Sequence, residues 1–303
     1  MTSTDLAFVF PGQGAQRPDM LDAVRHHPAF QSRLETICDA IGGDVERALR
    51  DDEAHADSNL LSSLLTVLVS SISLDEYRET RGETAGAMAG YSVGQWTAMY
   101  AAGCLSFESL VQVITTRGRF MDACFSETPG AMMAVIGVAP GHVEQFCERL
   151  RLEGHAIYLS NENCHGQYSL AGTVPAIDAA LHRIVSLGPK KAIRLPTSGA
   201  WHCPLVAAAE GPFGAFLRGI SLNAPGVRLI SNVTGDWVPS DRDALTGDLV
   251  RHLSHPVRWS RGIQTLIAGG CHRFVELGYG NMLTKFGFFV DRSVSHTAFL
   301  RGH

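Results

Sequence analysis

The stretch Gly90-Tyr91-Ser92-Val93-Gly94 decides how the rest of this chain is organised. It reads Gly-x-Ser-x-Gly, the pattern of a nucleophile elbow, in which a serine occupies a strained turn between a strand and a helix. The two glycines suit such a turn because a Cβ at either position would collide with neighbouring backbone. Small apolar residues at 86–89 lead into it, and an unbroken helical pattern at 95–102 leads out. These flanks favour a catalytic serine over a simple turn.

The composition is that of a globular protein. Of the 303 residues, 45% are hydrophobic and 18% are charged, and the formal net charge of −5 argues against nucleic acid or an anionic membrane as the main partner. The seven cysteines are scattered without a Cys-x-x-Cys pair, which favours reduced thiols and a cytoplasmic location. We expect no signal peptide, because residues 1–5 lack a basic region, and no apolar run that reaches the ~18 residues of a membrane span.

The order of patterns predicts an α/β fold. Residues 6–10 form a short apolar run typical of a buried parallel strand, followed by a glycine-containing loop that presents Gln13 at the carboxyl end of that strand. Residues 130–197 read as β-α-β-β-α-β, the ferredoxin-like order. We therefore expect an α/β-hydrolase-like large domain with a parallel sheet (1–129 and 198–303), an inserted ferredoxin-like small domain (130–197), and a ligand cleft between them.

A serine nucleophile needs a base, and His202 is the best candidate among the 13 histidines. It lies late in the chain, just before a proline, and the order serine then histidine is usual in elbow enzymes. An acid between Ser92 and His202 is not evident, so His202 is oriented either by a later carboxylate, such as Asp236 or Asp241, or by a backbone carbonyl. Surface positions are expected for His26, His27, His55, His252, His296 and His303.

Two arginines follow on one predicted helix, Arg117 and Arg119. Arg119 reads as solvated. Arg117 falls one turn from apolar residues and is expected to face inward, where a buried guanidinium implies a carboxylate partner from protein or substrate. A metal-binding pattern of the His-Glu-x-x-His kind is absent from the sequence, and no metal or bound cofactor is expected.

Taken together, these motifs resemble the malonyl-CoA:acyl carrier protein acyltransferase family, the discrete acyltransferases of fatty acid and polyketide biosynthesis. The resemblance covers essentially the whole chain. It rests on the early Pro-Gly-Gln-Gly, the elbow, the arginine, and four later segments at 202–205, 231–235, 256–259 and 276–280.

The resemblance implies roles for individual residues. Ser92 would carry the acyl group as an ester, with His202 as general base and then general acid. Gln13 and Val93 would form the oxyanion hole, and Arg117 would pair with the free carboxylate of malonate. A backbone carbonyl, here that of His255, would hold the catalytic histidine.

It also implies the substrates and the partner. A CoA thioester would be the donor, and the phosphopantetheine thiol of an acyl carrier protein would be the acceptor. Because such carriers are acidic, basic side chains would dock them, and we consider Arg149, Arg151 and Arg301.

Departures from the family pattern fall on residues that shape the acyl pocket. Tyr91 replaces the usual histidine of the elbow, Gln95 replaces a glutamate, and Trp201 stands where phenylalanine or serine is common. Residues 58–61 replace a Gln-Pro-Ala-Leu helix opening. The alternatives are therefore a dedicated transferase of another acyl, aminoacyl or peptidyl group between carrier proteins, a malonate-decarboxylase-type subunit suggested by residues 16–18, an editing thioesterase, or an inactive binding module.

Overall fold

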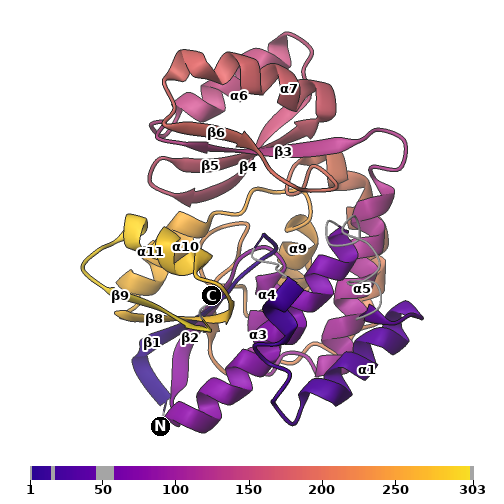
Figure 1. Cartoon of the computed structure of the whole chain (residues 1–303), viewed down its shortest axis with the longest axis vertical. Coiled ribbons are helices and arrows are strands. Elements are labelled where there is room, and N and C mark those ends of the chain that lie inside the picture. Colours follow the sequence, from indigo (N-terminus) through magenta and orange to yellow (C-terminus); the bar gives the residue numbers. More distant parts are fainter. Residues whose placement is uncertain (1, 15–17, 46–57, 301–303) are drawn as a thin grey trace.

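The computed structural model describes residues 2–14, 18–45 and 58–300. A parallel sheet forms the centre of the large domain, with strand order β7-β2-β1-β8-β9 (Figure 1). The strands span β1 (Thr2–Phe10), β2 (Thr84–Gly90), β7 (Arg228–Leu229), β8 (Arg273–Tyr279) and β9 (Ser295–Leu300). The predicted parallel sheet is confirmed. Strand β9 was not predicted.

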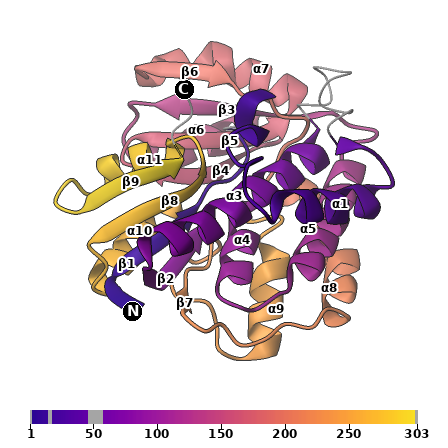
Figure 2. The ribbon, with the colours of Figure 1, turned by 60° about the horizontal axis from the view of Figure 1, so that its bottom comes forward.

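Both faces of this sheet are covered, because alternate side chains of β1 point to opposite sides. Leu6, Phe8 and Phe10 belong to the apolar core shared with α3, α4 and α5. Ala7 and Val9 pack with side chains of α10 and α11. Figure 2 shows the two helical layers with the sheet between them.

The helices of the large domain connect these strands. They span η1 (Pro18–Leu21), α1 (Phe30–Ile41), α3 (Asn59–Arg81), α4 (Gly94–Ala101), α5 (Phe107–Ala123), η4 (Pro204–Ala209), α8 (Glu210–Arg218), α9 (Arg242–Arg251), α10 (Trp259–Ala268) and α11 (Met282–Val290). Helix α10 begins only at Trp259, because the backbone N–H groups of Val257 and Arg258 donate to Ser160 O and Asn232 O instead.

Helix α3 is the longest element in the described ranges, and most of its residues are buried. Ser58 caps it by accepting a hydrogen bond from the Leu61 N–H. By length and hydropathy it would pass as a membrane span, contrary to our expectation that no apolar segment is long enough. However, 83% of its most apolar window is buried inside the fold. It is the core helix of the large domain.

The small domain is an antiparallel sheet with strand order β4-β5-β3-β6 and two helices on one face. Its elements are β3 (Gly130–Ile136), α6 (His142–Leu152), β4 (Ile157–Cys164), β5 (Gln167–Thr173), α7 (Val174–Arg183), η3 (Ile184–Leu187) and β6 (Lys191–Arg194). This β-α-β-β-α-β order confirms the predicted ferredoxin-like insertion. We propose 130–197 as its boundaries, because the second sheet begins and ends within them.

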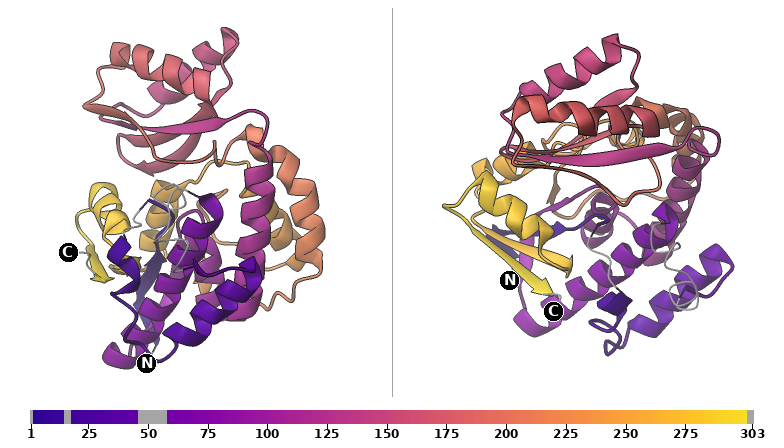
Figure 3. Two further views of the ribbon diagram at one scale, coloured as in Figure 1. Left: turned by 45° about the vertical axis from the view of Figure 1, so that its right-hand side comes forward. Right: turned by 45° about the horizontal axis from the view of Figure 1, so that its top comes forward.

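The open face of the small sheet lies toward the large domain, with α6 and α7 on the far side (Figure 3). Backbone hydrogen bonds join the two domains, from Val257 N to Ser160 O and from Glu162 N to Val257 O, each 2.9 Å long. The Ser160 hydroxyl also donates to Trp201 O at 3.0 Å. The cleft between the domains is therefore tied at β4, close to the predicted catalytic histidine.

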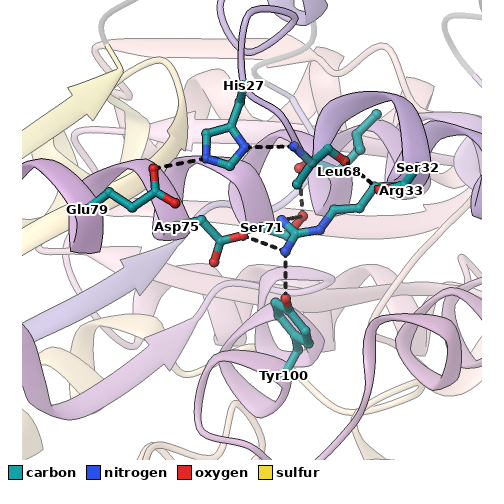
Figure 4. Close-up of polar contacts among 9 residues, drawn as sticks. His27, Ser32, Arg33, Leu68, Ser71, Asp75, Glu79 and Tyr100 are labelled. Atoms are coloured by element: carbon teal, nitrogen blue, oxygen red, sulfur yellow. Dashed lines mark hydrogen bonds and ion pairs between the residues drawn. The ribbon is translucent and has the colours of Figure 1, made fainter.

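A polar cluster joins α1, α3 and α4 within the large domain (Figure 4). The guanidinium of Arg33 bonds to Asp75, to Tyr100 Oη at 2.9 Å and to Ser71 Oγ at 3.1 Å. Beside it, the predicted surface residue His27 is buried and faces Glu79, 3.4 Å away. The prediction was wrong because the chain folds this histidine back against α3.

Candidate active site

The elbow forms as the glycine spacing predicts. Strand β2 ends at Gly90, and helix α4 begins at Gly94. A Cβ on Gly90 would lie 1.9 Å from Gly94 O, and one on Gly94 would lie 2.2 Å from Phe10 O. Ser92 adopts φ +53°, a left-handed conformation that is costly for any residue with a side chain. The turn places the Ser92 hydroxyl between the end of β2 and the start of α4.

Asn232 braces this strained turn. Its side-chain oxygen accepts from Ser92 N at 2.8 Å, and its amide donates to Gly90 O at 2.6 Å. Its own backbone N–H donates to Gln95 Oε1 at 2.9 Å. Gln95, which stands in place of the family glutamate, therefore supports the brace as an acceptor. Sequence reasoning marked 231–235 as a motif but missed this role.

His202 completes a hydrogen-bonded pair with the serine. Its Nε2 lies 2.7 Å from Ser92 Oγ, and its Nδ1 lies 2.8 Å from the backbone oxygen of His252. The expectation that a carbonyl replaces the missing acid is confirmed, but the predicted residue, His255, is wrong. The carbonyl comes from the C-cap of α9, one helical turn earlier, while exposed His255 contacts Arg251 O.

The alternative acids serve other purposes. Asp241 caps α9 by accepting from Ala244 N, and Asp236 accepts from Trp237 N. Burial, together with the smaller effect of the Arg117 charge, lowers the pKa of His202 to about 3, although the bond to His252 opposes the shift. The imidazole is therefore neutral at physiological pH, the form in which Nε2 can accept the serine proton.

Gln13 turns its side chain away from the serine. Its amide nitrogen lies 2.7–2.9 Å from Asn59 O and Oδ1, Ser62 Oγ and Ser63 Oγ at the start of α3. Within the described part of the chain, the backbone N–H groups of Gln13 and Val93 bond to no other group. Gln13 therefore has its backbone N–H, and not its side-chain amide, available as a donor to an oxyanion.

Arg117 is buried, as predicted, with 2% of its surface exposed. Among the described residues, its Nε has no hydrogen-bond partner. Burial lowers its pKa to about 10, and the nearby Asp122 opposes that shift. Asp122 in turn accepts from Asn59 Nδ2 at 3.0 Å. Arg117 is not among the residues that line the cavity, but its charge lies close enough to His202 to lower the pKa of that imidazole. Arg119 is exposed, as expected.

A cavity of about 380 Å³ opens above Ser92 and His202. Tyr91 and Trp201, two of the residues that depart from the family pattern, both line it. The Tyr91 hydroxyl donates to Asn163 Oδ1 of β4 at 2.6 Å, and burial raises its pKa. Trp201 is buried and packs edge-on against Phe125, with ring centroids 5.3 Å apart. Two buried aromatic side chains thus form part of the cavity wall. Its other lining residues include Met132, Asn161, Gln167, Ser169, Leu195, Thr197, Met282 and Phe286.

Two of the basic side chains considered for carrier docking, Arg149 and Arg151, do not line this cavity. Arg149 and Arg151 are exposed on α6, on the outer face of the small sheet (Figure 1). Arg151 bonds to Ile157 O at 2.9 Å and lies over the Tyr158 ring. Arg301 lies outside the described residues, as do residues 16 and 17, His55 and His303. In the described ranges, no group of three or more His, Cys, Asp or Glu side chains could hold a metal ion.

A serine on an elbow, a histidine bonded to it and a cleft above both define a class of α/β enzymes that form acyl esters on serine. The family model described as an acyl transferase domain matches residues 7–287. The chain belongs to this acyl transferase family.

Curated relatives and solved structures agree with this assignment. The malonyl CoA-acyl carrier protein transacylase of Escherichia coli strain K12 is 32% identical over 283 residues, covering 93% of this chain and 91% of that protein. The corresponding Bacillus subtilis protein is 30% identical, with coverages of 97% and 92%. The crystal structure of malonyl-CoA:acyl carrier protein transacylase from Xanthomonas oryzae superposes with a TM-score of 0.92 at 28% identity, covering 99% and 96% of the two chains.

A further structure contains a type II polyketide synthase acyl-carrier protein in complex with its malonyl-transacylase. Its matched chain has a TM-score of 0.90 at 26% identity, with coverages of 97% and 95%. The chain is thus an acyltransferase by family, and it spans nearly the full length of these relatives.

Proposed function

We propose that this enzyme transfers a malonyl group from malonyl-CoA to the phosphopantetheine thiol of an acyl carrier protein, through an ester on Ser92. The observation that carries the proposal is the 2.7 Å contact between Ser92 Oγ and a neutral His202. The malonyl-CoA transacylases among its relatives support the choice of acyl group. A soluble enzyme of this kind would meet both substrates in the cytoplasm.

The first half-reaction forms the ester. Ser92 Oγ attacks the thioester carbonyl while His202 Nε2 takes the hydroxyl proton. The resulting oxyanion accepts hydrogen bonds from the backbone N–H groups of Gln13 and Val93, each worth about 3 kcal/mol in the transition state. The C–S bond then breaks, and His202 returns the proton to the departing CoA thiolate.

The second half-reaction reverses the first with a new thiol. His202 deprotonates the carrier's phosphopantetheine thiol, which attacks the Ser92 ester. The C–O bond breaks, and Ser92 recovers its proton from His202. The bond from His202 Nδ1 to the His252 carbonyl keeps the ring oriented through both proton transfers.

Arg117 supplies the selectivity for a carboxylated acyl group. A buried guanidinium with an unpaired Nε gains more from a carboxylate than a solvated one would. The cavity of about 380 Å³, with Tyr91 and Trp201 in its wall, has room for a small acyl group. Carrier docking at Arg149, Arg151 and Arg301 remains a prediction.

Intact-mass measurement tests both the activity and its selectivity. Mixed with malonyl-CoA, the protein should gain one malonyl adduct that maps to Ser92 and moves to a holo-carrier when one is added. Arg117→Ala should lower the loading rate with malonyl-CoA at least about ten-fold more than with acetyl-CoA. Arg119→Ala, which removes an exposed arginine from the same helix, is the matched control and should load both normally.

Other outcomes identify the alternatives. Loading only from an acylated carrier, and from no CoA ester, would contradict the proposal and favour transfer between carriers. Rapid release of free malonate would favour an editing thioesterase. Equal losses for malonyl and acetyl in Arg117→Ala would refute the carboxylate role.

A further inference from the structure

His252 lies in the catalytic centre, although its sequence context predicts a surface position. It is the C-cap residue of α9 and is fully buried. Its carbonyl accepts from the catalytic imidazole, and its ring also stacks on that imidazole. The ring centroids of His202 and His252 are 5.0 Å apart, and the planes are inclined by 27°. One residue therefore contacts His202 both in the plane of its ring and on its face.

The His252 imidazole makes no polar contact that would explain its presence. Within the described residues, neither its Nδ1 nor its Nε2 has a hydrogen-bond partner. Burial and the nearby charged or titratable groups, His202 and Arg117, lower its pKa well below the ordinary value, so the ring is neutral. An unpaired buried N–H is unfavourable. The ring of this side chain does stack on the ring face of His202.

His202 needs such support because its own backbone is strained. It adopts φ +56°, and Ser92 adopts φ +53°, so both halves of the catalytic pair stand in a sparsely populated conformation. Two hydrogen bonds lie roughly along the edge of the imidazole, at Nε2 and Nδ1. These two bonds do not prevent the ring from tilting about the line that joins them. A flat side chain packed against the ring face prevents this tilt.

We propose that the His252 side chain is a positioning residue for His202. The inference rests on the proposed use of His202 as the base. The stacked ring holds the plane of the catalytic imidazole, keeps Nε2 aimed at Ser92 Oγ, and keeps water from the ring face. When His202 takes the serine proton, the flat π surface of neutral His252 lies beside the new cation, a favourable arrangement.

Substitutions of His252 separate its ring from its carbonyl, since every variant keeps the backbone. His252→Phe retains a flat ring without nitrogens, and His252→Gln retains a polar side chain without a ring. His252→Ala removes both. His255→Ala, which removes an exposed histidine three residues later, is the matched control.

The rate of Ser92 modification is measured from pH 5 to 9 with two reagents. Malonyl-CoA reports the proposed reaction, and phenylmethylsulfonyl fluoride reports activation of the serine whatever the acyl group. If malonyl-CoA fails to load the unaltered protein, the proposed function fails, while sulfonylation still tests His252.

We expect His252→Ala and His252→Gln to react about ten-fold more slowly with both reagents at an unchanged KM for malonyl-CoA. Their rates should also fall at the acid end of this range, because water then reaches His202 and raises its pKa toward the ordinary value. His252→Phe should recover the rate to within about three-fold and show no such fall at the acid end. His255→Ala should behave like the unaltered protein.

Two results would overturn the inference. One is a His252→Gln variant with the rate and pH profile of the unaltered protein. The other is a His252→Phe variant as slow as His252→Gln, because the ring face would then not be the active element. If His252→Ala does not fold, the comparison between His252→Phe and His252→Gln still tests whether the ring face positions His202.

Discussion

The bracing of the elbow by Asn232 can be tested by Asn232→Ala. This change removes the acceptor for Ser92 N at 2.8 Å and the donor to Gly90 O at 2.6 Å. Asn232 is buried, so both partners lose a bond that water does not readily replace. At about 1 kcal/mol for each net bond, plus the cost of the stranded backbone groups, the loss should be roughly 3 kcal/mol of unfolding free energy. For a chain of this length, that corresponds to a melting temperature lower by roughly 5 °C.

The same change should slow catalysis, because Ser92 can then relax from its positive φ. We expect the acylation rate to fall about 10- to 100-fold. Differential scanning calorimetry measures the first effect, and time-resolved intact-mass loading with malonyl-CoA measures the second. Asn223→Ala is the control, since its exposed amide makes one side-chain bond, to Gly103 O at 3.3 Å. Equal melting temperatures and equal loading rates for the two variants would refute the bracing role.

Two further predictions concern the buried imidazole of His202 and the close backbone contact at Gly94. Because His202 has a folded-state pKa of about 3 and titrates near 6.5 when unfolded, the unfolded state binds more protons between these values, so stability is lost as the pH falls through this range. Urea unfolding should show about 2 kcal/mol lost at pH 5 relative to pH 7, and this part should vanish in His202→Asn; an unchanged pH dependence in that variant would contradict the assignment. Gly94→Ala should abolish loading and cost more than ~4 kcal/mol of stability, because its Cβ would strike the carbonyl of Phe10. In calorimetry and loading assays Gly211→Ala, with open space around its Cβ, should match the unaltered protein.

Local sequence patterns predict much of the fold. A buried parallel strand needs a continuous apolar run, and residues 6–10 supply one that occupies the centre of the sheet. The order of strand and helix patterns over 130–197 likewise predicts the antiparallel insertion. The start of α10 is not set by a local pattern, because the residues before it are held by backbone hydrogen bonds to distant segments.

The elbow itself was predictable because its requirement is steric and local. Two glycines four residues apart are needed wherever backbone approaches this closely, and the serine between them must face outward. Arg117 could also be placed, since it lies one helical turn from apolar residues and is buried as that spacing predicts.

The sequence by itself therefore predicted the candidate nucleophile and its base, the fold class and the inward arginine, because these follow from short motifs and from the order of elements along the chain. Tertiary structure alone decided that the carbonyl behind His202 belongs to His252, that the Gln13 amide turns away from the serine, and that Asn232 supports the turn. These contacts join residues 46 to 140 positions apart. No local pattern records them, because they arise only when sheet, helices and insertion pack into one site.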